Sequence, residues 1–131
     1  MSGSPMMHEH QNAEIPDIIF VTEPDVHRHK RQKETTEDFV ERLATNLEDL
    51  ILREGPETIA AFIAEPVMGV GGVIIPPKNY FEKVQKILSK YGVLLIADEV
   101  ICGFGRTGNM FGSETLGMFP DIMTVAKGLS S

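Results

Sequence analysis

The sequence predicts an α/β fold in which helices flank a mainly parallel sheet. Short apolar runs alternate along the chain with longer segments whose apolar residues recur at helical spacing. The apolar runs contain few polar residues, which is typical of parallel strands that are buried on both faces. A strand, helix, strand order of this kind favours parallel pairing. With 42% hydrophobic residues among 131, the chain has enough apolar side chains to form a core.

The amino-terminal part contains a tail, a connection and the first helix. Residues 1–14 are polar, small and aperiodic, so we expect a disordered or expression-derived tail. Residues 15–34 predict an extended connection broken by two prolines, with a short buried strand at 18–21. The first helix is expected over 36–53, because threonine can cap it, acidic residues open its first turn and a Gly-Pro pair follows its end.

The remaining elements form a strand, helix, strand unit followed by a third strand. A continuous apolar run predicts a strand over 59–64, which we expect to be buried on both faces. A helix over 79–91 follows a glycine-rich loop and stops at a glycine. Apolar runs at 93–97 and 122–126 predict the second and third strands.

Charge and composition argue against several classes of protein. Lys and Arg number 12 against 19 Asp and Glu, for a net charge of -7, and no basic stripe follows a helix, so we expect no nucleic-acid partner. The apolar stretches are too short to span a bilayer, so we expect no membrane partner and a cytoplasmic location. The pairs His8 with His10 and His27 with His29 lie outside rigid elements, so no metal site is expected. Cys102 is the sole cysteine, which excludes an intrachain disulfide.

Three charged residues directly follow the predicted strands. Glu65 follows the first strand, Asp98 the second and Lys127 the third. In parallel α/β sheets, ligands gather beyond the carboxyl ends of the strands, because loops and helix N-termini meet there. A charge beside buried strands is costly when unpaired, so these side chains either pair with one another or hold a ligand. The residue types alone leave both interpretations open.

Three strings around these residues resemble the class-III aminotransferases, a branch of the fold-type-I pyridoxal-phosphate (PLP) enzymes. The strings are IAAFIAEPVMGVGG at 59–72, GVLLIADEVICGFGRTG at 92–108 and PDIMTVAKGLSS at 120–131. They follow the order of the family, and the similarity is closest to the omega-amino acid and amine:pyruvate transaminases. The resemblance implies that residues 15–131 are a fragment of the PLP-binding large domain, and that the full-length enzyme is a homodimer.

The resemblance also implies a cofactor-binding role for four residues. Lys127, the catalytic residue, would carry the cofactor covalently and move a proton, which requires an amine that can be neutral. Asp98 would pair with the ring nitrogen and keep it protonated, so that the ring acts as an electron sink. Val100 would pack on one face of the ring. Glu65 would lie on the substrate side and pair with a mobile arginine, and Ile101 stands where several class-III enzymes carry glutamine.

The implied activity is PLP-dependent transfer of an amino group from an amine or omega-amino acid to a 2-oxo acid such as pyruvate. Two alternatives stay open. One is a catalytically inactive truncated fragment that acts at most as an interaction module, since the phosphate loop and the small domain of the family would lie outside this sequence. The other is a dinucleotide-binding unit built on GFGRTG at 103–108, which matches G-x-G-x-x-G but is followed by no helical pattern.

Overall fold

The protein contains a three-stranded parallel sheet, as the sequence predicts. The computed structural model describes residues 17–130, so the predicted tail at 1–14 lies outside the described residues. The sheet has the order β1-β2-β3 and consists of β1 (Ala61–Ala64), β2 (Leu94–Asp98) and β3 (Ile122–Thr124). Both pairs of neighbours are parallel, and Asp98 lies opposite Thr124 at the end of β2. The predicted α/β class with a mainly parallel sheet and flanking helices is therefore confirmed.

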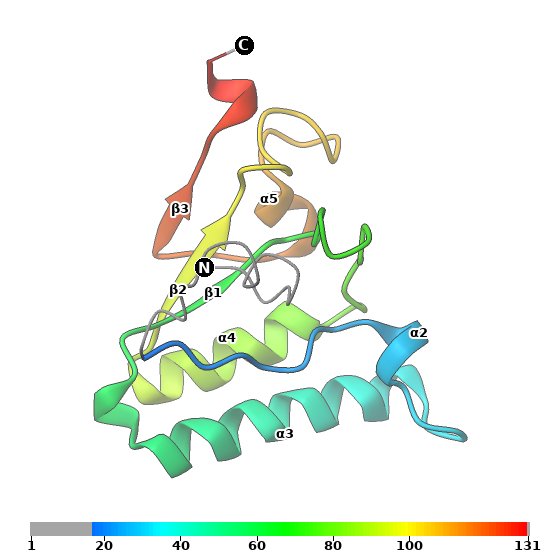
Figure 1. Cartoon of the computed structure of the whole chain (residues 1–131), viewed down its shortest axis with the longest axis vertical. Helices are drawn as coiled ribbons and strands as arrows, with labels where there is room; N and C mark the ends of the chain where they lie inside the picture. Colours follow the sequence, from blue (N-terminus) through cyan, green and yellow to red (C-terminus); the bar gives the residue numbers. More distant parts are fainter. Residues whose placement is uncertain (1–16, 131) are drawn as a thin grey trace, which may run out of the picture.

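Two long helices, α3 (Thr36–Glu54) and α4 (Tyr80–Tyr91), pack together on the same side of the sheet (Figure 1). Their apolar stripes face each other and the strands, because apolar residues in both helices recur at helical spacing. The buried core that results contains Phe39, Val40, Leu43, Leu47, Ile51, Tyr80, Phe81, Val84, Leu88, Val93, Leu95, Ala97 and Met118. This core supports the sheet from one side and leaves its carboxyl edge free for a site.

Local sequence signals account for the helix boundaries. The Thr35 hydroxyl accepts a hydrogen bond from the backbone N–H of Asp38 at 3.1 Å, and the Asp38 carboxylate accepts one from the backbone N–H of Thr35 at 3.2 Å. This reciprocal cap satisfies two N–H groups that a helix start leaves free. Gly55 with φ 91° ends α3 and Gly92 with φ 69° ends α4, in conformations that favour glycine. Both helices thus end within one residue of the predicted bounds.

The predicted strand at 18–21 is wrong. The structure shows an extended segment without strand pairing there, and Ile19 and Phe20 are 51% and 55% exposed. The sheet of the described residues consists of β1, β2 and β3 alone, so this segment is not one of its strands. Two short helices absent from the sequence prediction, α2 (Val26–His29) and α5 (Gly112–Leu116), lie in segments too short to show periodicity.

The expectation that the strands are buried on both faces is also wrong for this chain. Ile63, Leu94 and Ile122, one from each strand, are 39%, 44% and 46% exposed. β1 and β3 are also shorter than predicted, because the 3-10 helix η1 (Pro56–Thr58) precedes β1 and β3 ends at Thr124, whereas β2 keeps the predicted length and begins one residue later. The long helices α3 and α4 lie on one side of the sheet (Figure 1), and these three apolar side chains remain in contact with solvent.

Candidate active site at the carboxyl edge of the sheet

The three charged residues singled out in the sequence lie at one edge of the sheet. Asp98 is the last residue of β2, Glu65 directly follows β1, and Lys127 opens the 3-10 helix η2 (Lys127–Leu129) shortly after β3. All three strands point toward the end of the molecule that carries α5 (Figure 1). None of the ion pairs among residues 17–130 involves these three side chains. The interpretation as a mutual salt bridge is therefore not supported.

Asp98 is held at one carboxylate oxygen and open at the other. Its Oδ1 accepts hydrogen bonds from the backbone N–H of Val100 at 3.1 Å and from the Thr124 hydroxyl at 3.2 Å. Its Oδ2 has no hydrogen-bond partner within the part of the chain that the structure describes. A half-buried carboxylate with one fixed and one available oxygen suits a ligand that presents an N–H, such as a protonated ring nitrogen. The residues present thus fit the group that the resemblance implies.

Lys127 and Val100 line the same cavity, which has a volume of about 250 Å³. The remaining wall residues are Ile101, Gly103, Phe104, Arg106 and Gly128. Lys127 adopts a left-handed backbone conformation with φ 50°, which is uncommon for a non-glycine residue and recurs at functional sites. Asp98 and Glu65 are not part of the cavity wall. The site therefore combines an apolar cavity that contains an exposed amine with a carboxylate on the adjacent strand end.

Glu65 stabilises the loop that follows β1. Its Oε2 accepts a hydrogen bond from the backbone N–H of Gly69 at 2.9 Å. A methyl group on Gly69 would lie 2.3 Å from Cδ1 of Ile101, so the loop after β1 packs tightly against the loop after β2. No arginine within residues 17–130 pairs with Glu65. Its expected role as the partner of an arginine stays a prediction.

Glu99 lies inside the string at 92–108, but the sequence predicts no role for it; its side chain is completely buried, with 0% exposure. Its Oε2 accepts a hydrogen bond from the backbone N–H of Gly112 at 3.0 Å, and its Oε1 accepts one from Ser113 at 2.6 Å. One signal in the sequence could have found it. Leu95 and Ala97 face the buried side of β2, and strand alternation continues this side to position 99.

The GFGRTG segment does not form the turn of a dinucleotide site. It lies in a run of turns in which Gly105 and Gly108 have φ values of 91° and 99°. The next helix, α5, begins only at Gly112 and has 5 residues. A dinucleotide fingerprint instead opens directly into a long helix, whose N-terminus binds the pyrophosphate. The glycines here permit the left-handed turns of a loop that borders the cavity.

Among the described residues, Cys102, His27 and His29 do not add a second reactive centre, and the pair His8 with His10 lies outside the described residues. Burial raises the pKa of the Cys102 thiol, which donates a hydrogen bond to the carbonyl of Val67 at 3.3 Å, so a thiolate is disfavoured. His29 lies 2.9 Å from the Glu23 carboxylate. Among residues 17–130 no group of three or more His, Cys, Asp or Glu side chains could hold a metal ion.

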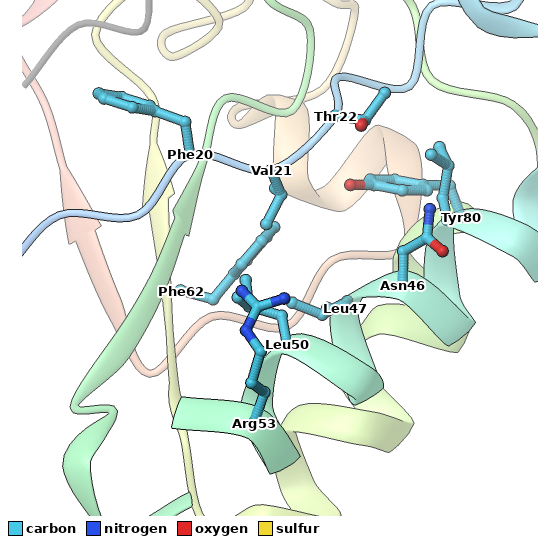
Figure 2. Close-up of a pocket in the computed structure, with 10 residues that line it drawn as sticks. Phe20, Val21, Thr22, Asn46, Leu47, Leu50, Arg53, Phe62 and Tyr80 are labelled. Carbon is cyan, nitrogen blue, oxygen red and sulfur yellow. The ribbon is translucent and has the colours of Figure 1, made fainter. Parts of the chain in front are cut away.

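A second cavity, of about 180 Å³, lies between the amino-terminal connection, α3 and β1 (Figure 2). Figure 2 shows Val21, Leu50 and Phe62 on its walls, with the Arg53 side chain beside them. None of the residues that follow the strands lines it. It is therefore separate from the candidate site.

The fold and the comparisons with known proteins define the class to which this chain belongs. All of its residues, 1–131, match the family model for aminotransferase class-III. The chain therefore belongs to the class-III aminotransferase family. No helix between residues 17 and 130 has the length and apolar character to cross a membrane.

The chain is also similar to several named aminotransferases. The chain is 59% identical over 131 residues to gamma aminobutyrate transaminase 3, chloroplastic, of Solanum lycopersicum, covering 100% of this chain and 25% of that protein. It is 54% identical to vanillin aminotransferase of Capsicum chinense, over 100% of this chain and 28% of that protein. The solved omega transaminase from Pseudomonas jessenii in complex with PMP has a TM-score of 0.95 and 54% identity, over 98% of this chain and 28% of that chain. The chain thus spans roughly a quarter of the length of these relatives.

Proposed function

We propose that residues 15–131 are the central part of the PLP-binding large domain of an aminotransferase. The complete enzyme transfers an amino group from an amine or omega-amino acid to a 2-oxo acid such as pyruvate, with pyridoxal 5'-phosphate as cofactor. The observation that carries the proposal is the location of a carboxylate held at one oxygen, Asp98, and of an exposed amine, Lys127, at the same edge of the sheet. Family membership and the names of the similar proteins support amino-group transfer.

Each site residue has a defined task in this proposal. When bound, PLP supplies an electron sink next to the carbon that carries the amino group. Lys127 would hold the cofactor through its amine and would move a proton to and from the substrate carbon. Val100 N–H and the Thr124 hydroxyl orient the Asp98 carboxylate through Oδ1, and its other oxygen would hold the protonated ring nitrogen of the cofactor. Val100 packs on the ring face, and Glu65 holds the loop on the substrate side.

The proposed enzyme is a longer polypeptide that works as a cytoplasmic homodimer. The chain covers 25% to 28% of the similar proteins named above, and the exposed apolar residues of the sheet need a cover that the described residues do not provide. The names of two plant relatives place those proteins in the chloroplast or the mitochondrion. Light scattering of the purified enzyme and fluorescence microscopy of a tagged version test the dimer and the location.

A half-reaction assay tests the activity. The PLP-loaded enzyme receives 4-aminobutyrate or a simple primary amine without an acceptor, and its visible absorption should change to that of the aminated cofactor. Removal of the donor and addition of pyruvate should restore the spectrum and yield alanine. Lys127→Ala should abolish both changes. Lys78→Ala is the matched control, because Lys78 is also an exposed lysine and lies outside the cavity wall. Full activity of Lys127→Ala would overturn the proposal.

The alternative of an inactive fragment has one observation in its favour. Ile63, Leu94 and Ile122 expose apolar surface that a stable isolated domain would bury. Addition of PLP to the 131-residue chain alone separates the two cases. The fragment interpretation predicts no change in the absorption of the cofactor, whereas binding through Lys127 predicts a shift. Calorimetric titration with NAD or NADP should give no heat, in line with the loop geometry at 103–108.

A further inference from the structure

The buried carboxylate of Glu99 is a costly feature that the proposed function does not use. Burial of an ion in a protein interior is unfavourable unless the charge is satisfied by strong hydrogen bonds or an opposite charge. No cation pairs with Glu99 within the described residues; its two oxygens accept the backbone N–H groups of Gly112 and Ser113 instead. These donors belong to the first two residues of α5, whose N–H groups have no partner inside the helix.

The space around this carboxylate is filled from three segments. A methyl group on Gly112 would lie 2.7 Å from Cβ of Cys102, 3.1 Å from Cβ of Pro66 and 3.3 Å from Oε2 of Glu99. Pro66 belongs to the loop after β1, Cys102 to the loop after β2, and Gly112 to α5. The carboxylate therefore closes the base of the loop over 100–111, whose first residues line the cavity.

The backbone of Glu99 connects the end of β3 with the loop after β2. Its N–H donates to the carbonyl of Thr124 at 2.9 Å, and its carbonyl accepts from the N–H of Gly103 at 2.9 Å. Thr124 is the residue whose hydroxyl holds Asp98. Since side chains alternate at the end of a strand, a rotation of the peptide at position 99 would also turn its neighbours Asp98 and Val100.

We propose that Glu99 is a positioning residue for the cofactor. Its carboxylate anchors the peptide between Asp98 and Val100, and so directs Asp98 to the ring nitrogen and Val100 to the ring face. The inference rests on the proposed function. A glutamine at position 99 has one acceptor oxygen and turns an N–H₂ toward the second backbone N–H, so one buried donor loses its partner.

The test uses the PLP-loaded full-length enzyme with Glu99→Gln. The matched control is Glu114→Gln, an exposed acid of α5, the helix whose first two N–H groups donate hydrogen bonds to Glu99. The dissociation constant of PLP should rise about tenfold in Glu99→Gln, which corresponds to about 1.4 kcal/mol. The pH profile of bound PLP, meaning the pH at which its absorption changes, should shift in Glu99→Gln relative to the unaltered enzyme, in the same direction as it shifts in Asp98→Asn. In the Asp98→Asn background, Glu99→Gln should move the profile no further. The control should leave affinity and profile unchanged.

A wild-type affinity and pH profile in Glu99→Gln would overturn the inference, even if thermal stability falls. A measurement on the unaltered enzyme does not depend on how the variant folds. Because coupling is reciprocal, PLP binding should slow hydrogen exchange at the amides of Gly112 and Ser113, and unchanged exchange there would also overturn it. Failure of the wild-type enzyme to bind PLP covalently at Lys127 would instead contradict the proposed function.

Discussion

Replacement of Gly69 by alanine tests how tightly the two loops of the site are packed. The added methyl group would lie 2.3 Å from Cδ1 of Ile101, whereas carbon atoms in favourable contact are about 3.5 to 4.0 Å apart. Either Ile101 must rotate into the neighbouring cavity or the loop that holds Glu65 must move. Overpacking of this kind costs about 1 to 3 kcal/mol, so we expect Gly69→Ala to lower the free energy of unfolding by about 2 kcal/mol.

A second substitution removes the clashing atom. Ile101→Val deletes Cδ1, and the nearest remaining atoms of the side chain are Cγ2 at 3.2 Å and Cγ1 at 3.4 Å from the added methyl group. Ile101 is half-buried and borders the cavity, so Ile101→Val alone should cost about 0.5 kcal/mol, the low end of the range for Ile→Val changes in cores. In the double variant the two changes compensate, so the total loss should be smaller than the sum by about 1 to 2 kcal/mol.

The assay is urea denaturation of the cofactor-free full-length enzyme and of the three variants. Gly71→Ala is the matched control, because its methyl group would first meet the flexible end of Met68 at 3.3 Å. It should change the free energy of unfolding by about 0.5 kcal/mol or less. Additive losses for Gly69→Ala and Ile101→Val would refute the contact on which the prediction depends.

Three further predictions concern the core, the acid stability and the site. Phe39→Ala removes a completely buried ring of α3 and should cost about 3 to 5 kcal/mol in urea denaturation, and a loss below about 1 kcal/mol would contradict its place in the core. The hydrogen-bonded Arg42 guanidinium lowers the pKa of Glu34 from 4.5 to about 2. This pair therefore stabilises the fold above pH 4.5, and its contribution is lost as the pH falls toward 2. Across this range the melting temperature should fall less steeply in Glu34→Gln than in the unaltered protein. Thr124→Val removes the hydroxyl that holds Asp98 and should weaken PLP binding about fivefold, or about 1 kcal/mol, whereas equal affinity by equilibrium dialysis would show that this hydrogen bond does not orient the carboxylate.

The elements that the sequence predicts well are those with local causes. The cap at Thr35 and the stop at Gly55 depend on neighbouring residues alone, so the bounds of α3 could be predicted closely. Whether both faces of the sheet are buried depends instead on segments that lie far from the strands in the sequence, so the strand residues alone do not decide it. The apolar pattern at Ile63 and Ile122 indicates surface that would be covered in a complete domain, and the described residues do not cover it.

For the candidate site as well, the sequence predicts some features and misses others. Parallel strands bring residues that follow them to one edge, so the common location of Glu65, Asp98 and Lys127 could be predicted from strand ends and the family resemblance. The sequence does not predict which oxygen of Asp98 is held and which is open, because this depends on the register between β2 and β3. Glu99 was missed because its partners are backbone N–H groups, which leave no mark in the residue types.

Covalent trapping tests the central claim most directly, namely that Lys127 carries the cofactor at the edge where Asp98 is held. The full-length enzyme loaded with PLP is reduced with borohydride, digested and mapped by mass spectrometry. The account predicts that the reduced cofactor is attached to Lys127 and to no other lysine of this chain. Attachment to a different lysine, or none at all, would contradict it.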